Sequence, residues 1–353
     1  MTEPLHILHL INHVKNVGNG IVNVAVDLAI EQRRSGHDVT VASAGGEFTA
    51  LLEAHGVRHL LLAQTGKQSV VALLRLSLFV RREKINIVHA HMMTGALIAR
   101  VSTTFTRTRV VTTVHNSWQR HAVLMKAGHS VIAVSEAVRL EMIGRGISPA
   151  KICTVHNGTV GSVRPQGATG KNLKSLESPA ILTIAGLYMR KGIIDLIQAA
   201  RILRESIPDV KIYIAGQGPD KDIFQDAVHT NGLEDTVIFL GFRQDVAALL
   251  KQGDVFVLAS HSEPFGLVLG EARQADIPIV ATNVGGIPEA LDGGNAGLLV
   301  PPHDPQALAE AIARVLQDKT LSDRLRCAGA ENLQALHVRR VSEETLDVYR
   351  KVL

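Results

Sequence analysis

The chain of 353 residues contains few of the residues on which several protein classes depend. Only two cysteines are present, Cys153 and Cys327, which excludes a disulfide framework and a sulfur-rich metal site, so we expect two reduced, buried thiols in a cytosolic protein. Aromatic residues make up 3%, which leaves few surfaces on which nucleic acid bases can stack. The first ten residues lack the pattern of a secretory signal, and no apolar run is long enough to cross a membrane.

Two common nucleotide-binding signatures are also missing. The chain has no Gly-x4-Gly-Lys-Ser/Thr sequence, which argues against a P-loop enzyme. The glycine pairs at 18–20 and 216–218 have Asn23 and Lys221 in place of the third glycine of the dinucleotide fingerprint, which argues against a dehydrogenase. The first of these turns still leads into a predicted helix start that suits an anion, although a plain strand-to-helix turn would look the same.

Charge is unevenly distributed along the chain. Residues 1–165 contain 18 Lys and Arg against 9 Asp and Glu (+9), whereas residues 166–353 contain 19 against 24 (−5). A basic half attracts nucleic acids, anionic membranes or anionic small molecules. The scarcity of aromatic residues disfavours nucleic acid among these partners.

Both halves repeat a short run rich in Val and Ile followed by a longer segment with helical spacing. This alternation predicts βαβ units around parallel sheets. We therefore expect an α/β protein with two tandem Rossmann-like, doubly wound domains at 1–165 and 166–337, joined by the Gly- and Ser-rich segment 160–178. The helical end, about 338–353, is expected to pack back on the first domain. Such sheets bind ligands beyond the carboxyl ends of their strands, so a cleft between two facing sheets is the expected site.

The expected elements follow from these runs. The strands are Leu5–Ile11, Val39–Ser43, Arg58–Leu62, Ile87–His89, Arg109–Val114, Val131–Val134, Ile152–Val155, Ala180–Ala185, Val210–Ala215, Val237–Leu240, Val255–Ala259, Ile279–Thr282 and Gly297–Val300. The main helices are Gly20–Ser35, Ser69–Lys84, Ser135–Gly144, Gly192–Glu205, Asp222–Asn231, Asp245–Lys251 and Gly266–Ala275.

The most informative segment is 259–272. Glu263 follows an apolar strand, Pro264 and Gly266 shape the next turn, and Glu271 lies in the first turns of the following helix. This placement predicts that both carboxylates face the ligand-binding edge of the sheet. The acidic pair in the run 220–222 instead opens a helix, where carboxylates cap N–H groups, so we interpret it as a cap and predict no metal site.

The pattern Ser-x-x-Glu-Pro-Phe-Gly-x-x-x-x-Glu-Ala after a strand resembles the acidic motif of the retaining glycosyltransferases of family 4, which have the GT-B fold. Other segments agree in order and spacing over essentially the whole chain, closely in the second domain and loosely in the first. They are Val155-His156-Asn157-Gly158, Ala185-Gly186-Leu187-Tyr188-Met189-Arg190-Lys191-Gly192, Ile214-Ala215-Gly216-Gln217-Gly218-Pro219, Phe239-Leu240-Gly241-Phe242 and Gly285-Gly286-Ile287-Pro288-Glu289.

The resemblance implies a binding site for the donor nucleotide. Arg190 and Lys191 would hold the donor diphosphate, a role that suits two adjacent cations before a glycine and a helix. Glu271 would accept hydrogen bonds from the ribose hydroxyls, and the backbone near Gly241 and Phe242 would meet the base.

The resemblance also implies contacts with the transferred sugar. Glu263, with the backbone of Phe265 and Gly266, would hold the hydroxyls of that sugar. His115 matches the first-domain histidine that approaches it, although a lone histidine is often structural. The candidate catalytic residues are therefore Glu263, His115, Arg190 and Lys191.

One departure from the family pattern lies after the first strand. The family commonly has Gly-Gly-x-Glu there, whereas this chain has Asn19-Gly20-Ile21-Val22. Gly20 still permits close approach of a phosphate or sugar, but Val22 is neither an acid nor a base.

Together these residues predict a glycosyltransferase without cofactor or metal. It would move a hexose-type sugar from a nucleotide diphosphate, with UDP expected, to an acceptor hydroxyl with retention, in cell-surface polysaccharide or glycolipid assembly. We expect it in the cytoplasm, and the apolar, basic-ended segment Val70–Lys84 fits both contact with an anionic membrane and a crossover helix. Two alternatives stay open, a non-hydrolysing nucleotide-sugar epimerase and a non-enzymatic two-lobed sugar- or nucleotide-binding protein.

Overall fold

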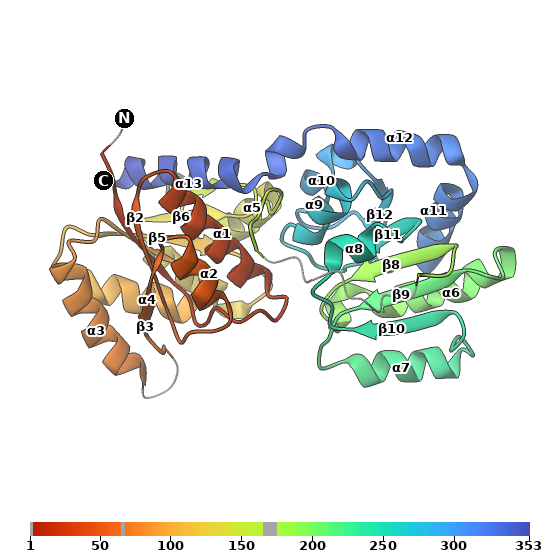
Figure 1. Cartoon of the computed structure of the whole chain (residues 1–353), viewed down its shortest axis with the longest axis horizontal. Helices are drawn as coiled ribbons and strands as arrows, with labels where there is room; N and C mark the ends of the chain where they lie inside the picture. Colours follow the sequence, from red (N-terminus) through yellow and green to blue (C-terminus); the bar gives the residue numbers. More distant parts are fainter. Residues whose placement is uncertain (1–2, 65–67, 165–174) are drawn as a thin grey trace. The chain divides into compact units, whose positions relative to one another are not determined.

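The computed structural model describes residues 3–64, 68–164 and 175–353. Two compact units are present, one formed by residues 1–164 with 336–353 and the other by residues 165–335. Each is built around one parallel sheet with helices packed on its faces (Figure 1). Of the expected interdomain segment 160–178, residues 165–174 lie outside the described residues.

The first unit contains a seven-stranded sheet in the order β3-β2-β1-β4-β5-β6-β7, with every described pair parallel. Its central strands are buried on both faces, which explains why they consist of nearly continuous apolar runs. The strands are β1 (His6–Leu10), β2 (Asp38–Ser43), β3 (Arg58–Leu61), β4 (Ile87–Ala90), β5 (Arg109–Val114), β6 (Ser130–Ala133) and β7 (Ile152–Thr154). The helices are α1 (Gly20–Arg34), α2 (Phe48–Ala54), α3 (Gln68–Arg82), α4 (Met93–Ser102), α5 (Glu136–Gly144) and α13 (Val338–Val352), with 3-10 turns η1 (Arg120–Ala127) and η2 (Pro149–Lys151).

The second unit repeats this topology with six strands in the order β10-β9-β8-β11-β12-β13. The strands are β8 (Ala180–Ile184), β9 (Lys211–Ala215), β10 (Val237–Gly241), β11 (Val255–Leu258), β12 (Ile279–Thr282) and β13 (Leu298–Val300). The helices are α6 (Ile193–Ser206), α7 (Lys221–Thr230), α8 (Val246–Leu250), α9 (Leu267–Gln274), α10 (Ile287–Ala290), α11 (Pro305–Gln317) and α12 (Lys319–Ala330), with turns η3 (Met189–Lys191), η4 (Asp292–Gly294) and η5 (Leu333–Leu336).

In both sheets the strand order reverses at one place, between β1 and β4 and between β8 and β11. Loops that leave neighbouring strands in opposite directions open a crevice at such a point, and ligands of doubly wound sheets bind there. The predicted fold class, two doubly wound parallel-sheet domains, is confirmed.

The last helix belongs to the first unit. Val160 and His337 form a parallel bridge, and Arg340 donates a hydrogen bond of 2.8 Å to the carbonyl of His156. A Cβ on Gly158 would lie 2.1 Å from the carbonyl oxygen of Leu336, so only glycine permits the two segments to lie this close. α13 therefore packs along α1 at a fixed register (Figure 1).

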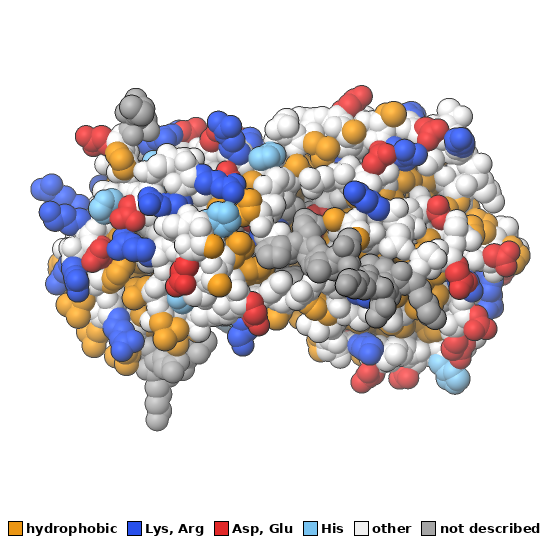
Figure 2. Space-filling view, viewed as in Figure 1, with side chains coloured by type: hydrophobic (Ala, Val, Ile, Leu, Met, Phe, Trp, Pro, Cys, Tyr) orange, Lys and Arg blue, Asp and Glu red, His pale blue; other side chains and the backbone are white. Residues whose placement is uncertain are grey.

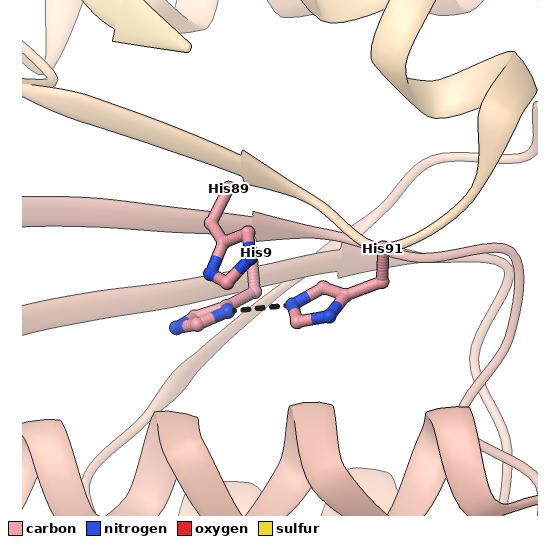
Figure 3. Close-up of side chains that lie close together, drawn as sticks. All are labelled: His9, His89 and His91. Carbon is pink, nitrogen blue, oxygen red and sulfur yellow. Dashed lines mark hydrogen bonds between the residues drawn. The ribbon is translucent and has the colours of Figure 1, made fainter. Parts of the chain in front are cut away.

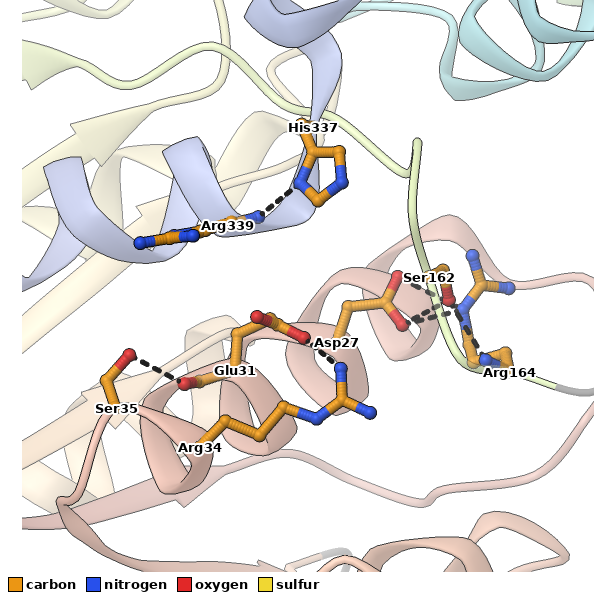
Figure 4. A network of polar contacts seen from close by, with 8 residues as sticks. All are labelled: Asp27, Glu31, Arg34, Ser35, Ser162, Arg164, His337 and Arg339. Atoms are coloured by element: carbon orange, nitrogen blue, oxygen red, sulfur yellow. Dashed lines mark hydrogen bonds and ion pairs between the residues drawn. The ribbon is translucent and has the colours of Figure 1, made fainter.

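A buried ion pair ties the end of the 156–164 segment to α1. The Asp27 carboxylate accepts hydrogen bonds from the Ser162 hydroxyl (2.6 Å) and from Arg164 Nε (3.0 Å), as Figure 4 shows. Burial raises the pKa of Asp27, while Arg164 and Ser162 oppose that rise by stabilising the charged form. The carboxylate side chain is 3% exposed, so its charge depends on these partners.

Two sequence expectations are wrong. Cys327 is exposed and Cys153 is only partly buried, because α12 presents Cys327 on its solvent side. Asp220 precedes α7, but its carboxylate makes no capping bond to that helix and instead accepts the N–H of Met189. In the part of the chain that the structure describes, no helix is both long and apolar enough to span a bilayer.

Candidate functional site

The turn after β8 carries Arg190 and Lys191, and neighbouring loops hold it in place. Asp220, at the start of α7, accepts the N–H of Met189 at 2.7 Å. The N–H of His261, just beyond β11, donates to the carbonyl of Arg190 at 2.8 Å. The two cationic side chains therefore start from a backbone fixed against the carboxyl ends of its neighbours in the sheet.

Gly192 makes the second of these contacts sterically feasible. Its φ is +64°, and a Cβ there would lie 1.8 Å from the carbonyl oxygen of Ala259. Any other residue would force the turn away from the end of β11. Glycine at this position thus brings Lys191 toward the acidic motif.

Lys191 forms an ion pair with Glu263, the first carboxylate of that motif. Both side chains are mostly buried, at 15% and 10% exposed. The Ser260 hydroxyl lies 3.5 Å from the same carboxylate, and the Glu263 carbonyl accepts the N–H of Gly286 at 3.0 Å. A Cβ on Gly285 would lie 2.0 Å from that carbonyl oxygen. Backbone and side chain of Glu263 are thus both held.

The remaining predicted donor-side residues also lie at the carboxyl edge of the second sheet. The Arg190 guanidinium stacks 4.3 Å from the centre of the Tyr188 ring, which restricts its orientation. Phe265 is buried, and Gly266, at φ +85°, begins α9, whose second turn carries the partly exposed Glu271. At the end of β10 the Gly241 carbonyl accepts the N–H of Gly216 at 2.8 Å, and the partly exposed Phe242 follows.

In the first unit, His115 follows β5 and lines a small pocket. Burial lowers its pKa to about 3, so its imidazole is neutral at physiological pH. The remaining lining comes from α1, the segment that joins β4 to α4, the start of α4, the end of β5, the loop after it and η1: Ile21, His91, Met92, Met93, Thr113, Val114, Asn116, Gln119, Ala122 and Met125.

Gly20 begins α1 beside the pocket-lining Ile21. The Asn19 side chain already accepts the N–H of Ile21 at 3.0 Å, so this helix start is partly capped by its own sequence. Val22 is completely buried in the core, so it replaces the acidic residue of the family pattern with a packing residue.

Sequence reasoning missed a cluster of buried histidines behind His115. His9 on β1 lies directly opposite His89 on β4, and His91 follows two residues later on the same face. Figure 3 shows the three rings close together on one side of the sheet, between the strands and a helix. The alternation His89-Ala90-His91 in a strand pattern was the available signal.

Among the residues that the structure describes, two groups of side chains have the composition of a metal site, and neither geometry fits one. His9, His89 and His91 have ligand atoms within 4.8 Å of one another, but every ring nitrogen already has a hydrogen-bond partner. In the second group, the ring centres of His261 and His303 lie 3.7 Å apart with the ring planes tilted by 34°, so lone pairs in the ring planes converge poorly on one ion. The third member, Asp195, is hydrogen-bonded to His261 at 2.7 Å.

Comparison with known proteins agrees with this geometry. Family models match residues 18–160 (Glycosyltransferase Family 4) and residues 168–332 (Glycosyl transferases group 1). The chain is 31% identical over 287 residues to a glycogen synthase of Mycobacterium tuberculosis, covering 75% of this chain and 68% of the relative. The chain belongs to the family 4 glycosyltransferases. It is therefore an enzyme of the transferase class that uses a nucleotide sugar.

Solved structures establish the GT-B fold. The Anabaena Alr3699/HepE protein in complex with UDP and glucose superposes with a TM-score of 0.82 at 22% identity, covering 98% of this chain and 99% of that chain. WaaG, a glycosyltransferase involved in lipopolysaccharide biosynthesis, superposes with a TM-score of 0.75 at 14% identity, covering 97% and 99%. The resemblance drawn from the acidic motif is confirmed at the level of family and fold.

Proposed function

We propose that this glycosyltransferase moves a hexosyl group from a UDP-sugar to an acceptor hydroxyl, with retention at the anomeric carbon and without a metal ion. The observation that carries the proposal is the ion pair of Lys191 with Glu263 at the carboxyl edge of the second sheet, beside Arg190. Two adjacent cations can bind the negative charges of a diphosphate, and a carboxylate can accept hydrogen bonds from sugar hydroxyls. The UDP and glucose bound to the HepE protein support UDP as the donor nucleotide.

The pair also suggests how the site changes when the donor binds. Diphosphate oxygens would draw the Lys191 ammonium from the Glu263 carboxylate, which then accepts hydrogen bonds from the sugar hydroxyls. As the bond from C1 to the phosphate oxygen breaks, Arg190 and Lys191 stabilise the charge that develops on the leaving diphosphate. The new bond to the acceptor oxygen forms on the same face, and the acceptor proton passes to the leaving phosphate. The two cations supply the charge that a metal would otherwise supply.

The decisive experiment removes the cations. The double variant Arg190→Ala/Lys191→Ala should bind UDP more weakly and turn over about 100-fold more slowly while keeping its circular dichroism spectrum. The matched control is Arg201→Ala/Lys251→Ala, two exposed cations of the same unit. Unchanged UDP affinity and rate in a folded Arg190/Lys191 variant would refute the assignment.

Product analysis addresses the finer claims. Activity should survive EDTA, and NMR of the product should show the anomeric configuration of the donor. Loss of turnover that Mg²⁺ or Mn²⁺ restores would refute metal independence. Conversion of the UDP-sugar to its epimer without acceptor would identify an epimerase instead, and binding without turnover over an acceptor panel would identify a binding protein.

For the acceptor, we propose a glycan intermediate anchored in an anionic membrane at the cytoplasmic face. The support is a surface of α3 and α4 in the first unit. On α3, Leu76 and Val80 are buried against the unit, whereas Val70, Leu74 and Leu78 are 68%, 59% and 69% exposed. A crossover helix needs only the buried stripe, so the outward apolar stripe has another cause.

Basic side chains accompany these exposed apolar residues. Leu97, Val101 and Phe105, on and just after α4, are also exposed, and Phe105 is 86% exposed. Exposed arginines of the same two helices and the following turn are Arg75, Arg81, Arg82, Arg100 and Arg107. Hydrophobic and basic side chains lie together over α3 at the lower left of Figure 2. This combination favours insertion into an anionic lipid surface, and the role of WaaG in lipopolysaccharide biosynthesis supports a cell-surface product.

Vesicle sedimentation tests this surface. The protein should pellet with phosphatidylglycerol vesicles at low salt, less at high salt because screening acts within about 8 Å at physiological ionic strength, and not with phosphatidylcholine. Leu74→Asp/Leu78→Asp should abolish pelleting, whereas Ile223→Asp, at a 52% exposed apolar position in the second unit, should not. No pelleting at low salt would refute membrane contact.

A further inference from the structure

A line of hydrogen bonds runs from α1 through the first sheet to His115. Gln32 Oε1 lies 2.8 Å from His9 Nε2, His9 Nδ1 lies 3.0 Å from His91 Nε2, and His91 Nδ1 lies 3.2 Å from His115 Nε2. The His9–His91 bond is drawn in Figure 3. Every member except His115 is at most 2% exposed, and His115 is 7% exposed, so water does not interrupt the line.

Each imidazole in the line is neutral. Burial lowers the pKa of His9 to about 4 and of His115 to about 3, and it lowers the pKa of His91 well below the ordinary value. A neutral imidazole has one N–H and one unprotonated nitrogen. Each ring therefore donates one hydrogen bond and accepts the other, and one end of the line determines the tautomer at the other end.

Gln32 sets that end. Its carbonyl oxygen faces His9 at 2.8 Å, and its amide nitrogen donates to the Tyr349 hydroxyl at 3.4 Å. Tyr349, carried by α13, is also 2.6 Å from His89 Nδ1, and His89 Nε2 is 2.7 Å from Thr113 Oγ1. In this arrangement the Tyr349 hydroxyl accepts a hydrogen bond from the Gln32 amide and donates one to His89 Nδ1, and His89 Nε2–H donates to Thr113 Oγ1. Every polar group of the cluster then has a hydrogen-bond partner while the Gln32 oxygen faces His9.

The order of donors then follows along the line. His9 donates its Nε2–H to Gln32, His91 donates its Nε2–H to His9 Nδ1, and His115 donates its Nε2–H to His91 Nδ1. The nitrogen of His115 left for a ligand is Nδ1, and it carries no proton.

We propose that Gln32, His9 and His91 are positioning residues that hold His115 in its Nε2–H tautomer, so that the pocket offers an obligate hydrogen-bond acceptor to a sugar hydroxyl. In the opposite tautomer Nδ1 of His115 would carry the proton. Its N–H could then donate a hydrogen bond to a sugar oxygen but could not accept one from the sugar hydroxyl. The choice of a sugar hydroxyl as ligand rests on the proposed function, but the tautomer itself does not.

NMR of the ligand-free, ¹⁵N-histidine-labelled full chain tests the tautomer directly. Long-range ¹H–¹⁵N spectra should show His9, His91 and His115 protonated on Nε2 alone at neutral pH, with assignments from single His→Asn variants. A proton on Nδ1 of His115 in the wild-type protein would overturn the proposal, whatever reaction the enzyme catalyses.

Two variants of Gln32 separate positioning from packing. Gln32→Glu still only accepts from His9 and should keep the His115 tautomer and most of the activity. Gln32→Met has a similar volume but no acceptor, so His115 should populate both tautomers and kcat should fall about tenfold, as for loss of one hydrogen bond, with the UDP Kd unchanged. Equal losses in both variants with an unchanged His115 tautomer, or wild-type kcat and tautomer in Gln32→Met, would overturn the proposal.

Discussion

Mild acid should destabilise the first unit through its buried histidines. Folding holds the pKa of His9 at about 4 and of His115 at about 3, against an ordinary value of 6.5. Below about pH 6.5 these histidines are therefore protonated in the unfolded chain but stay neutral in the folded chain. The free energy of unfolding is at its full value above about pH 6.5 and decreases as the pH falls toward the pKa values of the folded state. At about 1.4 kcal/mol per pH unit, each of the two residues lowers the free energy of unfolding by about 2 kcal/mol at pH 5.

His89 and His91 act in the same direction, because burial also lowers their pKa values. The expected loss between pH 7.5 and pH 5 is therefore at least about 4 kcal/mol, a large share of the 5–15 kcal/mol that stabilises a typical domain. Acid titration of this unit should begin well above the range in which carboxylates protonate.

Trp118, the only tryptophan, reports on this unit. Urea unfolding followed by its fluorescence at pH 7.5, 6 and 5 gives the pH dependence of the free energy of unfolding. His9→Asn should reduce that dependence by about 2 kcal/mol, whatever its effect at pH 7.5, whereas the exposed control His121→Asn should leave it unchanged. A free energy of unfolding that stays constant down to pH 5 would refute the reasoning.

Three further predictions concern local geometry. Gly192→Ala should lower Tm and UDP affinity more than Gly232→Ala. Both residues have positive φ, but a Cβ at 192 would lie 1.8 Å from the Ala259 carbonyl oxygen, whereas a Cβ at 232 meets nothing within 4 Å; equal effects would contradict the close-approach argument. Asp220→Ala should raise the KM for the UDP-sugar a few-fold, whereas Asp220→Asn, which keeps an acceptor for the turn, should not; equal KM values would contradict it. Arg164→Met should lower the free energy of unfolding by about 3–5 kcal/mol, because the buried Asp27 carboxylate loses its cationic partner, and the additional change Asp27→Asn should restore most of that loss. Strictly additive effects of the two changes in urea unfolding would contradict the coupling of the two residues.

The sheets could be predicted closely because their strands are buried on both faces. Such strands appear in the sequence as short runs of Val and Ile, which a helix of the same length would not require. The expected strands differ from the observed ones by at most one residue at either end. The acidic motif was equally accessible, since Glu263 and Gly266 lie in one continuous segment after a strand. The contact of Glu263 with Lys191 depends on a pairing between distant strands and required the structure.

The histidine line was beyond sequence reasoning for a similar reason. It depends on the register that sets His9 opposite His89, and on the last helix bringing Tyr349 beside Gln32 from 317 residues away. Asp220 shows how a local rule fails at a site. Its position before α7 predicts a cap, but the turn at Met189 presents an unsatisfied N–H closer to the carboxylate.

Backbone geometry explains why the second unit is the more recognisable half of the chain. Gly192, Gly216 and Gly285 follow three different strands, and a Cβ at each would lie 1.8, 1.8 and 2.0 Å from a carbonyl oxygen of a neighbouring loop. Close backbone approach of this kind is available only to glycine, and it gathers the turns after β8, β9 and β12 at one edge of the sheet. A site built in this way constrains the residue type at several positions at once. In the first unit the residues that line the pocket beside His115 come mostly from α1, β5, η1 and the start of α4, and under the proposed function these can differ with the acceptor while the hydrogen-bonded line from Gln32 to His115 stays the same.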